Sequence, residues 1–286
     1  MRFDTHLHVW WPGDGAAIRI RSRIPELDRD FSLARVRPAL VASGVSQVIL
    51  VSAAQQEDEN ERLLAVAREN ADIVAGVIGW LDLEAPDVAK RAAHHRKDSR
   101  WLGVRLPLTI HPDRRFISRA AVRGGLEALR DQGIVAQFLA GPDQLPDVAA
   151  AIGSVQGLRA IIDHAGTPDF AAAPTILWKA GISALARLPD TACKVSTFWN
   201  PGDPPVSDDR ALAFFSHVAE TFGPHRMIAA ANWPPSSLAG PYEESWNRLD
   251  RLAALTGFCQ ADHDAVCEIT ARLFLRIGAD FASDIE

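Results

Sequence analysis

Short runs of apolar and β-branched residues alternate along the chain with longer segments whose apolar positions recur at helical spacing. Each short run is bounded by glycine, proline or polar residues, which is typical of a buried strand. Eight strands are therefore predicted: Arg2–Trp10, Ser46–Val51, Ile73–Leu81, Trp101–Leu106, Ile134–Leu139, Leu158–His164, Thr191–Ser196 and Arg226–Asn232.

Start and stop signals for helices flank the longer segments. Ser32 precedes the first of them and Gly44 follows it, as expected of an N-cap and a C-terminal stop. The predicted helices are Leu33–Ser43, Glu59–Asn70, Asp87–Lys97, Ser118–Gln132, Pro142–Ile152, Pro174–Leu188 and Ser207–Phe222, with Pro241–Leu255 and Asp262–Ile277 after the last strand.

The strands recur about every 32 residues, which is the length of a strand joined to a crossover helix. This regularity predicts a single (β/α)8 TIM barrel domain over residues 1–286, with an extra C-terminal helix. The alternative is an open doubly wound sheet. Such a sheet would carry a glycine-rich G-x-G-x-x-G loop after its first strand, and residues 11–15 read Trp-Pro-Gly-Asp-Gly instead.

Composition narrows the possible partners. The 286 residues include 30 Lys and Arg against 36 Asp and Glu, a net charge of −6 that disfavours a nucleic-acid partner. No apolar run reaches the roughly 20 residues that span a bilayer, and polar residues stand where a secretory signal would need an apolar stretch. With only three cysteines, the chain is expected to be a cytoplasmic protein with reduced thiols.

Polar residues gather at the predicted strand ends, where TIM barrels place their active sites. Residues 4–10 read Asp-Thr-His-Leu-His-Val-Trp. Strict alternation would point Asp4, His6, His8 and Trp10 into the barrel, and Phe3, Thr5, Leu7 and Val9 toward the helices. Two imidazoles two residues apart on a strand can aim at one point, which suits a divalent metal or an anionic substrate.

His164 ends the sixth strand beside Asp163, and a charged pair after an apolar run needs partners if it is buried. It is interpreted as a ligand or a general base, or else as a capping residue at a helix start. Arg105 shares a strand face with Gly103 and could bind a carboxylate or an ester oxygen, or form an ion pair at the rim. Further candidate substrate contacts are Gln137, Lys194, Trp10, Trp80 and Trp233, although the tryptophans could equally be core residues.

Several segments together resemble the amidohydrolase superfamily, and within it the amidohydrolase-2 or sugar-lactonase-like branch. They are residues 4–10, 76–83 (Gly-Val-Ile-Gly-Trp-Leu-Asp-Leu), 103–105 (Gly-Val-Arg), 162–166 (Ile-Asp-His-Ala-Gly), 193–196 (Cys-Lys-Val-Ser) and 232–234 (Asn-Trp-Pro). The branch includes fuconolactone, rhamnonolactone and dicarboxylate-lactone hydrolases. The resemblance implies a (β/α)8 barrel that hydrolyses a sugar-acid or dicarboxylate lactone.

The resemblance also implies a set of site residues. His6, His8, His164 and the residue at position 232 would form the catalytic site, and Arg105 would contact the substrate. Some members of the branch hold one divalent metal, here zinc or manganese on His6, His8 and His164, and others work without a metal.

One position departs from the family pattern. Members usually carry Gly-Ser-Asp-Trp-Pro where this chain has Ala-Ala-Asn-Trp-Pro at residues 230–234. The aspartate is the expected general base, and the Asn232 amide cannot take its proton at neutral pH.

Three mechanisms follow from this departure. In one, a metal activates the water and Asn232 orients it. In another there is no metal, His164 is the base, and His6, His8 and Arg105 stabilise the oxyanion. In the last, Asn232 disables turnover. Two other functions stay open: a metal-dependent decarboxylase of the same superfamily, and a barrel that binds a sugar acid or lactone without turnover.

Overall fold

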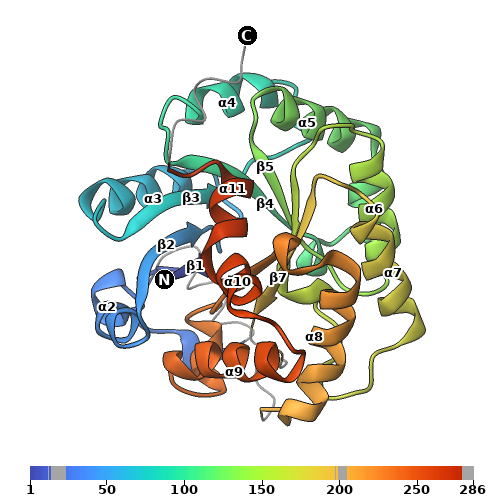
Figure 1. Ribbon diagram of the computed structural model, residues 1–286. Helices are drawn as coiled ribbons and strands as arrows, with labels where there is room; N and C mark the ends of the chain where they lie inside the picture. Colours follow the sequence, from blue (N-terminus) through green and yellow to red (C-terminus); the bar gives the residue numbers. More distant parts are fainter. Residues whose placement is uncertain (12, 14–23, 197, 199–204, 279–286) are drawn as a thin grey trace.

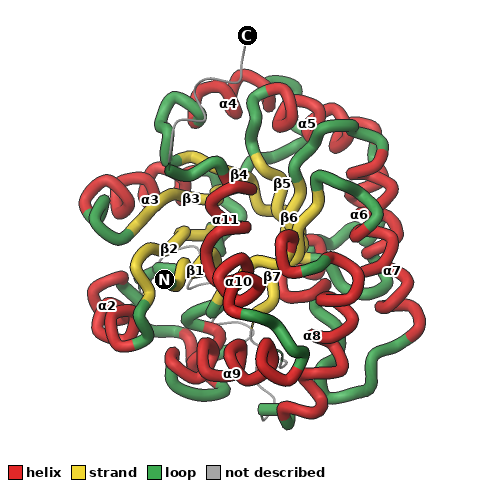
Figure 2. The backbone as a smooth tube through the Cα atoms, viewed as in Figure 1, coloured by secondary structure: helices red, strands yellow, loops and turns green. Residues whose placement is uncertain are grey.

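The computed structural model describes residues 1–286 except 12, 14–23, 197, 199–204 and 279–286. Its centre is a parallel sheet of eight strands that follow one another in chain order, with helices around it (Figures 1 and 2). The strands are β1 (Arg2–Leu7), β2 (Val45–Val51), β3 (Val74–Gly79), β4 (Trp101–Pro107), β5 (Val135–Leu139), β6 (Ala160–Ile162), β7 (Thr191–Ser196) and β8 (Met227–Ala230).

The last strand lies beside the first and so closes the sheet into a barrel. The backbone N–H of His8 donates to the carbonyl oxygen of Trp233 at 2.8 Å, and the Thr5 hydroxyl donates to the carbonyl oxygen of Ala229 at 2.9 Å. All eight predicted strands are present, so the predicted (β/α)8 barrel is confirmed.

Helices cover the outside of the barrel. They are α2 (Leu33–Ala42), α3 (Asp58–Glu69), α4 (Val88–His95), α5 (Ala120–Asp131), α6 (Leu145–Gly153), α7 (Ile176–Ala186), α8 (Asp208–Phe222) and α9 (Tyr242–Leu255). The predicted C-terminal helix is α10 (Gln260–Asp264), a π-helical turn (Ala265–Ile269) and α11 (Thr270–Leu275), and α11 lies across one end of the barrel (Figure 1). Of the helices in the described part of the chain, none combines the length and apolar character needed to cross a bilayer.

The barrel interior is built in two layers. Near the strand starts, apolar side chains form one cluster that α11 covers through Ala271 and Leu275; its strand members include Phe3, Ile49, Ile78, Val135, Ile161, Ala192 and Ile228. Because side chains on a strand alternate, the residue two positions further along faces the same lumen one level higher. On β5 and β7 that residue is polar, Gln137 and Lys194, and Arg105 of β4 pairs in register with Gln137.

The first strand breaks strict alternation. Phe3 faces the lumen, whereas Asp4 points outward and accepts a hydrogen bond from the Tyr242 hydroxyl of α9 at 2.7 Å. The pairing of β1 with β2 is irregular between Asp4 and Leu7, which brings His6 back into the lumen. The predicted orientations of Phe3 and Asp4 are therefore wrong, because a local irregularity exchanges the two faces of the strand.

Candidate active site

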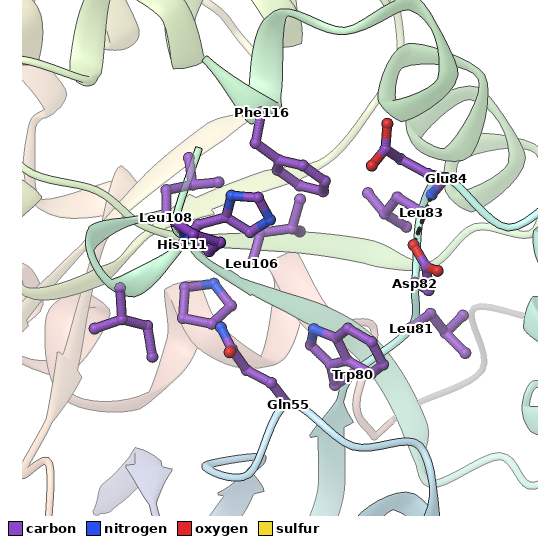
Figure 3. A pocket seen from close by; sticks show the side chains of 13 residues that line it. Gln55, Trp80, Leu81, Asp82, Leu83, Glu84, Leu106, Leu108, His111 and Phe116 are labelled. Atoms are coloured by element: carbon purple, nitrogen blue, oxygen red, sulfur yellow. Dashed lines mark hydrogen bonds between the residues drawn. The ribbon is translucent and has the colours of Figure 1, made fainter. Parts of the chain in front are cut away.

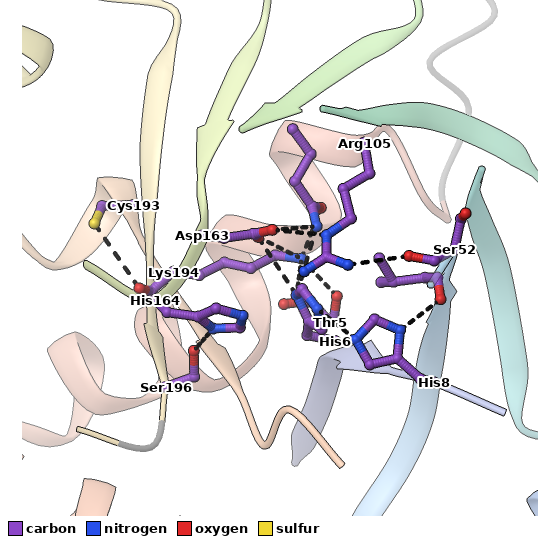
Figure 4. Close-up of polar contacts among 12 residues, drawn as sticks. Thr5, His6, His8, Ser52, Arg105, Asp163, His164, Cys193, Lys194 and Ser196 are labelled. Carbon is purple, nitrogen blue, oxygen red and sulfur yellow. Dashed lines mark hydrogen bonds and ion pairs between the residues drawn. The ribbon is translucent and has the colours of Figure 1, made fainter. Parts of the chain in front are cut away.

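The polar layer at the C-terminal ends of the strands brings the predicted site residues together (Figure 4). His6 and His8 come from the end of β1, and a short turn directly after β6 carries Asp163 and His164. All of the following side chains are buried: His6, His8, Arg105, Gln137, Asp163, His164, Lys194 and Ser196. The cluster is thus a desolvated constellation of charged and hydrogen-bonding groups at the end of the barrel that carries the active site in this fold.

Hydrogen bonding fixes the tautomers of the histidine pair. His8 Nδ1 lies 2.7 Å from the carbonyl oxygen of Val51, which can only accept, so Nδ1 carries the proton. His8 Nε2 then accepts from His6 Nε2, 3.1 Å away, and His6 Nδ1 is left as an acceptor. Lys194 Nζ, at 3.4 Å, faces that nitrogen as a donor. Burial lowers the pKa of His8 to about 3 and holds the pKa of His6 well below its usual value, so both rings are neutral.

Asp163 is the hub of the cluster. Its Oδ2 accepts from Arg105 Nε at 3.2 Å and from Gln137 Nε2 at 3.1 Å. Its Oδ1 has no hydrogen-bond partner and lies 3.4 Å from His6 Nδ1 and 3.8 Å from Lys194 Nζ. Burial by itself raises the pKa of Asp163, but the positive charge that faces it, that of the Lys194 ammonium included, outweighs this effect and holds the pKa well below its usual value.

Lys194 is a buried cation at the centre of this network. Its ammonium donates to the carbonyl oxygen of Thr5 at 2.7 Å and to Gln137 Oε1 at 2.8 Å. Burial lowers the pKa of Lys194 to about 8, with Asp163 opposing the shift. The ammonium is therefore charged at neutral pH, and it neutralises Asp163 inside the barrel.

His164 stands in a left-handed backbone conformation, with φ of 50°. Histidine is enriched in that conformation among non-glycine residues, and such strain is common at functional sites. Its Nδ1 lies 2.6 Å from Ser196 Oγ, and its ring centroid is 4.5 Å from that of His6. Burial lowers the pKa of His164 to about 4, so its imidazole is neutral and able to accept a proton.

Asn232 follows β8 and also has a positive φ, 56°. The backbone pairing of Leu7 and His8 with Trp233 places it beside the histidine pair. Its side-chain amide makes no hydrogen bond within the described part of the chain, and the residue is 9% exposed. Asparagine tolerates this conformation well, so the backbone here suits the residue that is present.

The three predicted tryptophans have different surroundings. Trp10 is fully buried: its Nε1 donates to the carbonyl oxygen of Leu27 at 3.2 Å and its ring packs on Phe31, so its substrate contact remains a prediction. Trp233 also packs on Phe31, with ring centroids 5.2 Å apart. Trp80 lines a pocket of about 410 Å³ above β3 and β4, together with Phe116 and other residues (Figure 3).

Two groups in the site were not predicted from the sequence: the Asp163 carboxylate and the backbone carbonyl oxygen of Ser52. Asp163 was noted as a charge that needs partners, but no role was assigned to it. Arg105 Nη1 donates to the backbone carbonyl oxygen of Ser52 at 3.1 Å, and a backbone acceptor carries no residue-type signal. Together these two partners hold the guanidinium in place, while Nη2 forms no hydrogen bond within the described part of the chain.

The neutral histidines make stability depend on pH. The unfolded chain protonates its histidines near pH 6.5, whereas His8 and His164 protonate near pH 3 and 4 when folded. Between these limits the unfolded state binds more protons, so the free energy of unfolding falls as the pH falls, by about 1.4 kcal/mol per pH unit for each such histidine. Urea unfolding of the chelator-treated protein at pH 7.5, 6 and 5 measures this slope. The variant His8→Gln should have a smaller slope, and an equal slope would contradict the assignment.

Comparison with known proteins supplies the family. The family model described as "Amidohydrolase" matches residues 3–277. The chain belongs to the amidohydrolase family. It is 32% identical over 273 residues to a Burkholderia multivorans protein named L-fucono-1,5-lactonase, with 88% of each chain covered. It is 29% identical over 241 residues to a protein of the same name from Burkholderia ambifaria, covering 84% of this chain and 83% of the relative.

A solved structure resembles this amidohydrolase closely. It is an amidohydrolase from Burkholderia multivorans with bound zinc, with a TM-score of 0.89, 29% identity, and coverage of 97% of this chain and all of the other. The donor set here fits such an ion. His6, Asp163 and His164 each offer a ligand atom within 4.8 Å of the others, and Asp163 Oδ1 is buried without a hydrogen bond. The 3.1 Å between the Nε2 atoms of His6 and His8 also matches two nitrogens about 2.0–2.1 Å from one zinc ion.

Proposed function

We propose that this amidohydrolase opens a small lactone by attack of an activated water. The observation that carries the proposal is the pairing, in one buried cluster, of a neutral imidazole on His164 with the anchored guanidinium of Arg105. The first can take a proton from water, and the second can stabilise a carbonyl oxygen as it becomes negative. Relatives named as lactonases over most of their length support the same chemistry.

Each residue of the cluster has its own role in the reaction. With His164 Nδ1 as the donor to Ser196 Oγ, 2.6 Å away, Nε2 is free to take a proton from water. The water oxygen then bonds to the lactone carbonyl carbon, and Arg105 Nη2 stabilises the oxyanion. The ring C–O bond breaks, and the leaving alkoxide recovers the proton from His164, giving an open-chain hydroxy acid. Asn232 orients the water or a substrate hydroxyl.

A divalent metal, zinc or manganese, would give an alternative route, in which the His164 ring is a ligand and no longer the base. His6, His8 and His164 are the predicted ligands, and Asp163 is a further donor among them. When bound, the ion would lower the pKa of the water and polarise the carbonyl. The buried Lys194 ammonium supplies a fixed positive charge in the same cluster.

The substrate class we propose is a sugar-acid lactone. The pocket beside the site has an aromatic wall, Trp80 and Phe116, which suits the flat apolar face of a sugar. Asp82 and Glu84 also line it, and its described lining includes no Arg or Lys. A second carboxylate on the substrate would meet negative charge there, so dicarboxylate lactones are expected to be poorer substrates.

Hydrolysis of a lactone panel tests this function. We expect proton release from sugar-acid lactones with the chain as it stands, and less from dicarboxylate lactones. The same panel is run with Asn232→Asp and with added zinc or manganese, which shows whether the metal is needed. Activity confined to Asn232→Asp would show that the reaction needs a carboxylate base at position 232. No activity in either chain would favour binding without turnover. Release of carbon dioxide from aromatic carboxylates would instead indicate a decarboxylase.

A further inference from the structure

A second pocket, of about 490 Å³, lies at the opposite end of the barrel from the proposed active site. Its walls come from the turns that lead into β5, β6 and β7, from the ends of α4 and α5, and from the residue after α11. Four arginines line it against two carboxylates: Arg96, Arg130, Arg159 and Arg276 against Asp131 and Asp190. In a chain with a net charge of −6, this pocket is a local concentration of positive charge.

Three of these arginines have no carboxylate partner. Arg130 is bound by its sequence neighbour, with Nε 2.8 Å from Asp131 Oδ1. Arg96, Arg159 and Arg276 form no ion pair with any residue that the structure describes. What distinguishes the set is that all three arginines line one pocket.

Arg159 is the fixed member of the set. Its Nη1 donates to the carbonyl oxygen of Phe274 in α11 and its Nη2 to that of Gly133 before β5, each at 2.5 Å. These bonds hold a partly buried guanidinium at the base of the pocket. Burial and the nearby charges of Arg276 and Arg96 lower the pKa of Arg159 to about 10, so it is still charged at neutral pH. Arg96 and Arg276 thus act on Arg159 as like charges, and the Asp190 carboxylate opposes them.

We propose that this pocket binds a compact anion carrying two or more charges on phosphoryl or carboxylate oxygens. Such an anion would offset the positive charge that Arg96 and Arg276 place near Arg159, and the planar guanidinium matches both oxygen types in bidentate geometry. The site lies beyond the apolar layer of the barrel and shares no residue with the proposed active site. By joining Arg276 to Arg159, the anion would also fasten the end of α11 to the barrel.

Titration calorimetry with pyrophosphate and, separately, with citrate tests the site and shows which oxygen type it prefers. Sodium chloride keeps the ionic strength constant, so that general screening does not change. We expect saturable binding of one anion per chain. The double variant Arg96→Gln/Arg276→Gln should weaken it by at least about tenfold, because charge-assisted hydrogen bonds are lost. Both side chains are exposed, so the fold should be unaffected.

Two control variants locate the bound anion. Arg187→Gln removes an exposed arginine just after α7, at the same end of the barrel but outside the pocket, and should bind as the parent does. Arg105→Gln removes the unbonded guanidinium nitrogen of the active site and should also retain binding. The proposal fails if neither anion binds saturably, if the double variant binds as tightly as the parent, or if Arg105→Gln abolishes binding.

Discussion

The variant His164→Asn is expected to lose about 10²–10⁴-fold in kcat for lactone hydrolysis, the usual contribution of a general base. Asparagine suits the left-handed backbone at this position, where φ is 50°, so the change removes the base without new backbone strain. Steady-state kinetics on the best lactone of the panel measure the loss. Near-UV circular dichroism checks that the fold is retained.

Ser196→Ala provides the matched control for this prediction. Ser196 touches the other nitrogen of the same ring, at 2.6 Å, so its loss frees the imidazole to rotate but leaves the base in place. We expect a smaller fall in kcat than for His164→Asn, together with a shift in the acid limb of the pH–rate profile. Full activity in His164→Asn would show that His164 is not the base, and the route in which a divalent metal activates the water would then be favoured.

The barrel could be predicted from the sequence because each of its layers leaves a local signal. Runs such as Val48–Val51 are apolar because both faces of a barrel strand are buried. Strand ends were less certain. The prediction extended the sixth strand to His164, whereas β6 stops at Ile162 and the chain turns through four consecutive positive-φ residues, from His164 to Thr167.

The site could be predicted only in part. His6, His8, Arg105 and His164 were found because charged or imidazole side chains at strand ends are costly to bury without a function or a partner. The outward orientation of Asp4 was missed, since it depends on hydrogen bonds to Tyr242 and to the backbone of Ala231, more than 200 residues away. The central position of Asp163 was missed for the same reason: its partners come from β1, β4, β5 and β7 and meet only in the folded barrel.

The variant Asp163→Asn is expected to lower the free energy of unfolding by about 3–5 kcal/mol, the usual penalty for leaving a buried charge without its partner. Asp163 is the carboxylate that faces both Arg105 and Lys194 inside the barrel, and it is fully buried. Its low pKa means that this stabilisation is present above about pH 3.8, the unfolded value, and is lost only as the pH falls through the lower folded value. Urea unfolding at pH 7.5 measures the loss.

A double-mutant cycle with Lys194→Met separates this electrostatic loss from a packing defect. Methionine keeps most of the lysine volume, so the double variant removes both the anion and the cation that lies 3.8 Å from it. If the two charges stabilise each other, the double variant will be less destabilised than the sum of the single variants, by about 1–3 kcal/mol. Simple additivity would mean that Asp163 stabilises the barrel through Arg105 and Gln137 alone. The burial of Lys194 would then be explained by its hydrogen bonds to Thr5 and Gln137, and its positive charge would be available to a substrate oxygen.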